Sequence, residues 1–313
     1  MPQKIILDVD TGGDDAVAIL LAGHHPEIEL VAVTVVHGNS PLDTTLENTL
    51  RVLEAGQLSH VPVYCGAESP LVAESLSAHE FQRRELALPP ATISPQPQRA
   101  VDFLVEYYSD TESHDTILVP VGPQTNLALA LRIEPNLSTS IPSIITMAGA
   151  FGDGNATPSA EFNVLADPEA AHIVFNSGIP LTMVGLEVTR QALLTLEEVY
   201  KINSLGTPWA QVAAGIIEQE VSWFIEQLGW TGGQIFDACA VAAVIDPGIL
   251  ETNPMHVDIE LHGGLTRGRT VADISNRLGN ESNVDVGVGI DHKKFIQILH
   301  EGFGISSRLN KTG

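Results

Sequence analysis

Residues 5–16 read IILDVDTGGDDA, an apolar run that leads into four carboxylates and a pair of glycines. The apolar run predicts a β-strand over Ile5–Val9, and the residues after the glycines predict a helix over Asp14–Gly23. A strand that feeds directly into a helix is typical of β-α units, from which parallel sheets are built. The carboxylates therefore stand at the carboxyl end of a strand, the edge at which parallel α/β sheets bind ligands.

The alternation of strand and helix continues along the chain. Further strands are expected over Leu30–Val36, Val61–Tyr64, Ile117–Val121, Ile144–Met147, Leu181–Val184, Val257–Leu261 and Val284–Ile290. Further helices are expected over Leu42–Ala55, Arg99–Tyr108, Thr125–Leu131, Pro168–Asn176 and His292–His300, with Thr207–Asp246 mostly helical. This order indicates an α/β fold, a doubly wound and mainly parallel sheet with helices on both faces. Because no linker of biased composition divides the chain, residues 1–313 are expected to form a single domain.

Charge and composition exclude several classes of partner. The 313 residues include 15 Lys or Arg and 39 Asp or Glu, a formal net charge of −24 at pH 7. A surface this acidic repels phosphate, so nucleic acid and anionic membranes are not expected as partners. Two cysteines, Cys65 and Cys239, cannot build a disulfide framework and fit a reducing compartment. With no stretch long enough for a membrane span or signal peptide, we expect a cytoplasmic protein.

Four acids, Asp8, Asp10, Asp14 and Asp15, lie within eight residues of one another. Like charges this close repel, and a hard divalent cation with oxygen ligands relieves that repulsion at neutral pH. Capping of the helix is the alternative, but capping needs one acid or two and leaves Asp8 and Asp10 without a role. The segment therefore predicts a metal site.

An Asp-x-Asp after an apolar strand also resembles the haloacid-dehalogenase phosphotransferases, in which the first Asp is a nucleophile and Mg²⁺ its partner. That family expects Thr or Val two places after the second Asp, where this chain has Gly12. A phosphotransferase is therefore the alternative mechanism.

Polar residues also follow other predicted strands. They are His37-Gly38-Asn39, then Gly122–Asn126, and then Asn155, Glu161 and Asn163. Singly, each is typical of loops and helix caps. Together they would ring one edge of the sheet with carboxylates and carboxamides, which suit the hydroxyl groups of a sugar better than phosphates.

With these motifs the chain resembles the nucleoside hydrolases of the inosine–uridine-preferring type. Residues 8–16 are similar to the family's Asp-Thr-Asp-Pro-Gly-x-Asp-Asp-Ala, with Thr11 in the place of Pro. The likeness continues in order at residues 37–39, 122–128, 160–171, 237–240 and 286–295. It implies a calcium-dependent hydrolysis of the N-glycosidic bond of ribonucleosides, which gives free base and ribose.

The resemblance also implies a role for individual residues. The implied Ca²⁺ ligands are Asp10, Asp15, Asp237 and the backbone carbonyl of Thr125. The implied ligands of the 2′- and 3′-hydroxyls are Asp14, Asn39 and Asn163, those of the 5′-hydroxyl are Asn155 and Glu161, and Asp237 also faces the substrate. Asp10 is further implied to take a proton from the attacking water. Carboxylates near the sugar stabilise the positive charge that develops as the base departs.

One position departs from the family pattern. In the inosine–uridine-preferring members a His precedes the metal-binding Asp and helps to protonate the leaving base, whereas here Phe236 precedes Asp237. Purine-preferring relatives carry an aromatic residue there that stacks on the base, so Phe236 predicts a weak preference for purines. His79 or Phe81, from a proline-rich excursion over Ser69–Pro97 that would cover the site, could join the stack. Ordinary helix packing is the alternative role of Phe236.

Two further expectations concern the protein as a whole. The resemblance implies a homodimer or a homotetramer. Because a phenylalanine cannot donate a proton, the alternative from a different functional class is a non-catalytic protein that binds nucleosides or sugars.

Overall fold

The computed structural model describes residues 1–76, 86–110 and 115–304. In this part of the chain an eight-stranded sheet has the order β3-β2-β1-β4-β5-β6-β12-β9. Its strands are β1 (Gln3–Val9), β2 (Ile28–Val35), β3 (Val63–Cys65), β4 (Ile117–Pro120), β5 (Ile144–Met147), β6 (Leu181–Val184), β9 (Leu250–Met255) and β12 (Val284–Ile290). All neighbours are parallel except β9, which runs antiparallel to β12. The chain winds outward from β1 in both directions, which confirms the doubly wound α/β fold.

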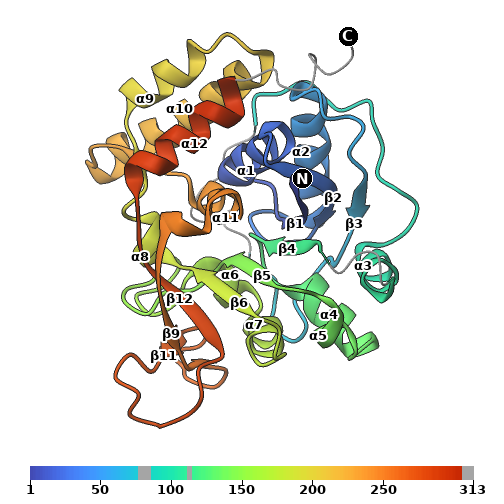
Figure 1. Ribbon diagram of the computed structural model, residues 1–313, viewed down its shortest axis with the longest axis vertical. Coiled ribbons are helices and arrows are strands. Elements are labelled where there is room, and N and C mark those ends of the chain that lie inside the picture. Colours follow the sequence, from blue (N-terminus) through green and yellow to red (C-terminus); the bar gives the residue numbers. More distant parts are fainter. Residues whose placement is uncertain (77–85, 111–114, 305–313) are drawn as a thin grey trace.

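Helices cover both faces of the sheet (Figure 1). One face carries α1 (Gly13–His24), α2 (Leu42–Ala55), α8 (Leu186–Thr189), α9 (Leu196–Asn203), α10 (Pro208–Leu228), α11 (Phe236–Ile245) and α12 (His292–Gly304). The other carries α3 (Ala100–Ser109), α4 (Thr125–Ile133), α5 (Leu137–Ser140), α6 (Phe162–Ala166) and α7 (Pro168–Phe175). Each face buries its own hydrophobic core, as a sheet with apolar residues on both sides requires.

Side chains alternate along β1 between the two cores, and this alternation turns the side chain of Asp8 away from the edge of the sheet at which a ligand would bind. Ile5 belongs to the core under α1 and Ile6 to the core under α4. Asp8 shares the orientation of Ile6, and its carboxylate accepts hydrogen bonds from Thr34 on β2 (2.6 Å) and Asn126 on α4 (2.7 Å). Burial raises the pKa of this carboxyl to about 7. Asp8 therefore ties β1 to its neighbours, a role that the sequence did not reveal.

The C-terminal region differs most from the expectation. The stretch predicted as Val257–Leu261 forms β10 (Val257–Ile259), which pairs with β11 (Thr270–Ala272) in a separate antiparallel ribbon. The edge strand β9 was not predicted, because Asn253-Pro254 and its mostly exposed side chains lack a strand pattern. An edge strand tolerates proline, since one side of it needs no ladder hydrogen bond. A second ribbon joins β7 (Leu193–Leu194) to β8 (Gly233–Gln234), and the 3₁₀ turn Pro247–Ile249 precedes β9.

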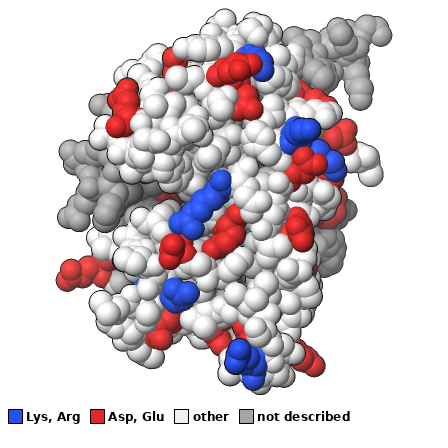
Figure 2. Space-filling view, turned by 90° about the vertical axis from the view of Figure 1, so that its left-hand side faces the viewer, with Lys and Arg blue, Asp and Glu red and all other residues white. Residues whose placement is uncertain are grey.

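Charged side chains of both signs are interspersed on the face shown in Figure 2, and most of that face is uncharged. A continuous basic strip of the kind that binds nucleic acid is not seen on it. Among the described residues, none of the helices combines the length and apolar character that a transmembrane span requires.

Candidate active site

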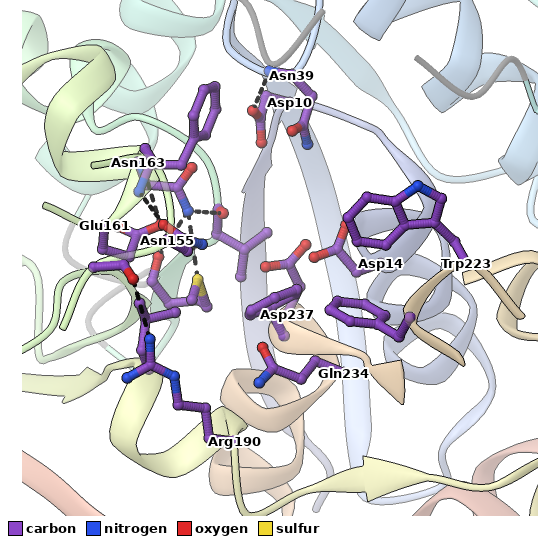
Figure 3. A pocket seen from close by; sticks show the side chains of 18 of the residues that line it. Asp10, Asp14, Asn39, Asn155, Glu161, Asn163, Arg190, Trp223, Gln234 and Asp237 are labelled. Atoms are coloured by element: carbon purple, nitrogen blue, oxygen red, sulfur yellow. Dashed lines mark hydrogen bonds between the residues drawn. The ribbon is translucent and has the colours of Figure 1, made fainter. Parts of the chain in front are cut away.

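A cavity of about 490 Å³ lies at the carboxyl edge of the sheet (Figure 3). Val121 follows β4 and Met147 ends β5, and together with Leu186 on α8 they supply apolar contacts. Most of the remaining lining falls into three groups: acids at the carboxyl end of β1 and at the N-termini of α1 and α11, a polar wall from the segment after β5, and an aromatic wall from α10, the loop after it and α11. The cavity thus stands where a doubly wound sheet is expected to bind its ligand.

Carboxylates from two helix N-termini gather in the cavity. Asp14 and Asp15 lie in the first turn of α1, and Asp237 lies in the first turn of α11. One oxygen from each lies within 4.8 Å of the others, and Figure 3 shows Asp14 and Asp237 facing each other. The positive ends of the helix dipoles favour ionised acids at these positions. The packing of α1 against α11 therefore brings together acids that are far apart in the sequence.

Asp10 lies next to this group and is held in place by its neighbours. Its Oδ2 accepts the backbone N–H of Asn39 at 2.6 Å, and its own N–H donates to Oδ1 of Asp15 at 3.0 Å. Glycines surround it, because a Cβ at Gly38 would lie 2.1 Å from Oδ2 and a Cβ at Gly122 would lie 2.7 Å from Oδ1. Asp10 is only 1% exposed. The two glycine motifs after β2 and β4 thus make room for this one carboxylate.

Asp15 both caps a helix and belongs to the acidic cluster. Its Oδ2 accepts the N–H of Gly12, the N-cap of α1, at 2.9 Å and Nδ2 of Asn39 at 3.2 Å. These hydrogen bonds favour the ionised form, but burial outweighs them and the pKa of Asp15 is raised. Capping and metal binding, which the sequence set against each other, are therefore compatible for this residue.

The donor set fits a hard divalent cation. Asp10, Asp15 and Asp237 are buried, and within the described ranges no ion pair joins them or Asp14 to a Lys or Arg side chain. Burial first, and then the neighbouring carboxylates, raise the pKa of Asp10, Asp14 and Asp237 well above the usual range. Oxygen ligands with unrelieved negative charge are what Ca²⁺ and similar ions require.

On the polar wall, hydrogen bonds set the orientation of two carboxamides. Asn163 donates from Nδ2 to the backbone carbonyls of Val121 (2.7 Å) and Met147 (3.0 Å), which leaves its Oδ1 to accept from a ligand. Asn155 accepts the N–H of Phe162 at Oδ1 (2.9 Å), which leaves its Nδ2 to donate. The wall therefore presents one acceptor and one donor, a pattern suited to hydroxyl groups.

Glu161 stands between these amides and caps α6. Its carboxylate accepts the backbone N–H groups of Asn163 (2.9 Å), Gly149 (2.9 Å) and Val164 (3.2 Å). Burial raises the pKa of Glu161, and these three hydrogen bonds oppose the rise. The side chain is only 2% exposed and is fixed at the edge of the cavity.

Two side chains of the α8 region hold the loop that carries Asn155. Arg190, the residue after α8, donates from Nη2 to the carbonyls of Asp153 (2.9 Å) and Gly154 (3.1 Å). Glu187 accepts the N–H of Gly152 at 2.8 Å. Sequence reasoning missed both residues, because neither stands in a motif and only the fold brings α8 to this loop.

Aromatic rings form the wall opposite the polar one. Trp223 and Phe224 come from α10, Trp230 from the loop after it, and Phe236 from the start of α11. The ring centres of Phe224 and Trp230 are 5.0 Å apart in a stacked arrangement, and Phe224 lies 6.3 Å from Phe236. Such a wall suits a planar, uncharged ring. Both tryptophans, Trp223 and Trp230, line the pocket.

Residues 5–297 match the family described as inosine-uridine preferring nucleoside hydrolase. The chain belongs to this family. Over 303 residues it is 39% identical to the pyrimidine-specific ribonucleoside hydrolase RihB of Escherichia coli (strain SE11), and the match covers 96% of each chain. Nucleoside hydrolases act on N-glycosyl bonds, so this assignment decides against both the phosphotransferase and the non-catalytic binding protein.

Solved structures agree with the assignment to the nucleoside hydrolases. The purine-preferring ribonucleoside hydrolase from Gardnerella vaginalis superimposes with a TM-score of 0.87 at 32% identity, over 96% of this chain and 98% of that one. An inosine-guanosine nucleoside hydrolase gives a TM-score of 0.84 at 30% identity, over 96% and 98% of the two chains. The fold and the family are therefore the same by sequence and by structure.

In this nucleoside hydrolase most of the predicted site residues meet in the cavity. Those that line it are Asp10, Asp14, Asn39, Asn155, Glu161, Asn163, Phe236 and Asp237. Asp15 is fully buried beside Asp10. Thr125 begins α4 and is buried, and its hydroxyl donates to Asp167 at 2.7 Å. Its backbone carbonyl as a metal ligand stays a prediction, as do the individual roles of the other residues.

The proline-rich excursion over Ser69–Pro97 is described only in part. Ala91 donates its N–H to Glu47 (3.3 Å), and Thr92 donates its N–H to Glu54 (2.6 Å), so this stretch lies along α2. The cavity-lining residues of the described ranges include none from the excursion. His79 and Phe81, predicted to join the base stack, lie outside the described residues.

Proposed function

We propose that this nucleoside hydrolase is calcium-dependent and releases free base and ribose from ribonucleosides, with a weak preference for purines. The observation that carries the proposal is the meeting of an acidic cluster, a polar wall and an aromatic wall in one cavity. A ribonucleoside has three matching parts: an anomeric carbon that becomes positively charged, a set of hydroxyls and a planar base.

The residues proposed to hold Ca²⁺ are Asp10, Asp15, Asp237 and the backbone carbonyl of Thr125. Ca²⁺ takes roughly six to eight oxygen ligands, so Asp14 and substrate hydroxyls can complete the set. When bound, the cation lowers the pKa of a water molecule and fixes its direction of approach. The relief of repulsion among the buried carboxylates supports this assignment.

Asp10 is proposed to take a proton from the water that attacks the anomeric carbon. The N–H of Asn39 holds one of its carboxylate oxygens, which fixes the direction of the other. As the C1′–N bond breaks, its electron pair leaves with the base, and the oxygen of water bonds to C1′. Asp14 and Asp237, which line the cavity with carboxylate oxygens within 4.8 Å of each other, would stabilise the positive charge that develops on the sugar.

The sugar hydroxyls are proposed to bind on both sides of the cluster. Asp14, Asn39 and Asn163 would bind the 2′- and 3′-hydroxyls, and Asn155 and Glu161 the 5′-hydroxyl. Asn39 donates from Nδ2 to Asp15 at 3.2 Å, so its Oδ1 accepts from the sugar. A 5′-phosphate would meet the carboxylate of Glu161, and this repulsion favours nucleosides over nucleotides.

The weak preference for purines rests on Phe236. A phenylalanine stacks on a base but cannot protonate it, and purines carry a basic ring nitrogen that water can protonate instead. The relatives divide on this point. RihB, 39% identical, is named pyrimidine-specific, and the Gardnerella vaginalis enzyme, 32% identical, is named purine-preferring.

One assay series tests the proposal. The protein is incubated with inosine, guanosine, uridine, cytidine and a phosphomonoester, with Ca²⁺ or with a chelator, and the release of ribose and phosphate is measured. We expect ribose alone, only with Ca²⁺, and a higher kcat/KM for the purines. Release of phosphate without ribose would contradict the proposed N-glycosyl hydrolysis. Ribose release in the presence of the chelator would contradict the dependence on Ca²⁺, and faster cleavage of uridine than of inosine would contradict only the preference for purines. A homodimer or homotetramer and a cytoplasmic location stay predictions, and light scattering after size exclusion tests the first.

A further inference from the structure

A glutamine of the cavity has a polar group for which the described part of the chain offers no partner. Gln234 is 3% exposed and lines the cavity, and among the described residues its Nε2 has no hydrogen-bond acceptor. Figure 3 shows the side chain beside Asp237, directed into the cavity. A buried amide without a partner costs on the order of 1–3 kcal/mol, so a partner from a ligand is favoured.

The backbone of Gln234 is held by its neighbours, which fixes the point from which its side chain extends. Gln234 belongs to β8 and pairs with Leu193 of β7. The preceding Gly233 lies against α10, where an added Cβ would be 2.6 Å from Cα of Val221 and 3.1 Å from the ring of Phe224. The strand pairing and this close approach together place the glutamine just before the N-terminus of α11.

The neighbours of Gln234 belong to the aromatic side of the cavity. It stands two residues before Phe236, and the residue before it packs against Phe224. The groups proposed to bind the 5′-hydroxyl, Asn155 and Glu161, come instead from the segment after β5. A substrate that places its sugar against the polar wall and its base against the aromatic rings therefore brings the base to Gln234.

We propose that Nε2 of Gln234 donates a hydrogen bond to an acceptor on the nucleobase close to the glycosidic nitrogen, and that this bond strengthens as the base departs. This inference rests on the proposed function. Such acceptors are the O2 carbonyl of pyrimidines and the N3 nitrogen of purines. When the C1′–N bond breaks, its electron pair stays on the base, so an acceptor there gains negative charge. Gln234 transfers no proton. The attacking water gives its hydroxyl oxygen to C1′ and one proton to Asp10, which returns that proton to solvent, and the departing base takes its proton from solvent water.

The test replaces the amide by an apolar group of similar length and changes the leaving group. In the full-length protein with Ca²⁺, Gln234→Met is compared with wild type on uridine, on inosine and on 4-nitrophenyl β-D-ribofuranoside. The aryl riboside has the same sugar but lacks an acceptor beside the glycosidic bond. We expect kcat/KM for the nucleosides to fall about 10- to 100-fold and kcat/KM for the aryl riboside to stay within about twofold. Gln211→Met, an exposed position on α10, makes the same chemical change away from the cavity and should alter neither.

The remaining outcomes separate this inference from the function on which it rests. Equal losses on nucleosides and aryl riboside would assign Gln234 a structural role, and no loss would exclude the hydrogen bond. Gln234→Leu, which also removes the donor and adds no charge beside Asp237, should reproduce the selective loss and carries the test where the Met variant does not fold. A wild-type protein that releases no ribose from any nucleoside would reject the proposed function and this inference with it.

Discussion

Asn39 donates its backbone N–H to Asp10 at 2.6 Å, so the turn after β2 positions the acid that follows β1. The two residues are 29 positions apart in the sequence and meet because β1 and β2 are parallel neighbours. Parallel pairing places the ends of both strands at one edge, where a single hydrogen bond can hold the acid.

Asp10→Asn should strongly reduce the rate of ribose release while leaving the fold intact. An amide has nearly the shape of the carboxylate but cannot take a proton, and the loss of a general base costs about 10²- to 10⁴-fold in rate. Steady-state kcat on inosine measures the effect. Asp8→Asn makes the same change two residues earlier, on the α4 face of the sheet, and should retain most of the activity. Comparable losses in both variants would contradict the assignment.

Metal removal should make stability depend on pH. In the chelated protein the pKa of Asp10, Asp14 and Asp237 lies well above the usual 3.8, so the folded state holds protons that the unfolded state releases. The contribution of these three groups to the free energy of unfolding is then greatest below about pH 4, and it is lost as the pH rises through their raised pKa values. Ca²⁺ replaces the protons and should restore the Tm at about pH 8.

Calorimetry between about pH 5 and 8, with a chelator or with excess Ca²⁺, measures this effect. Sodium chloride at matched ionic strength is the control for screening. A Tm that is independent of both pH and Ca²⁺ would show that the acidic cluster holds no cation.

Phe236→Ala should lower kcat/KM for inosine without affecting the binding of Ca²⁺. Stacking of a base on an aromatic side chain is worth about 1–3 kcal/mol, or roughly 5- to 150-fold. The rise in Tm with Ca²⁺ reports metal binding, and Phe236→Tyr keeps the ring as a control. If the Ala variant keeps full activity on inosine, Phe236 serves only in helix packing.

Arg190→Ala should weaken the recognition of the 5′-hydroxyl. Arg190 donates hydrogen bonds to the carbonyls of Asp153 and Gly154, just before Asn155. We expect kcat/KM for inosine to fall about tenfold, the size of one lost hydrogen bond, and that for 5′-deoxyinosine to change little. Glu161→Gln should show the same selectivity. An equal loss on both substrates would point to general disruption of the loop.

The sequence predicted the parts of the site that follow strands. Apolar runs that alternate with helical segments predict a parallel sheet, and parallel strands deliver their carboxyl ends to one edge. Asp10, Asn39 and Asn163 therefore could be placed together from sequence alone. The family resemblance suggested the roles of these residues. It also pointed to Asp237, which no local sequence pattern connects to residues 10–15.

Other features of the site do not follow from the positions of the strand ends, and only the tertiary structure determines them. Asp8 faces α4 because side chains alternate along β1, whereas its neighbour Asp10 has left the strand and turns to the cavity. The hydrogen bonds from Arg190 to the loop depend on how α8, α10 and β8 pack, and so does the lack of an acceptor for Nε2 of Gln234 within the described part of the chain. Packing between segments far apart in the sequence follows from the shapes of many side chains at once, and no local periodicity records it.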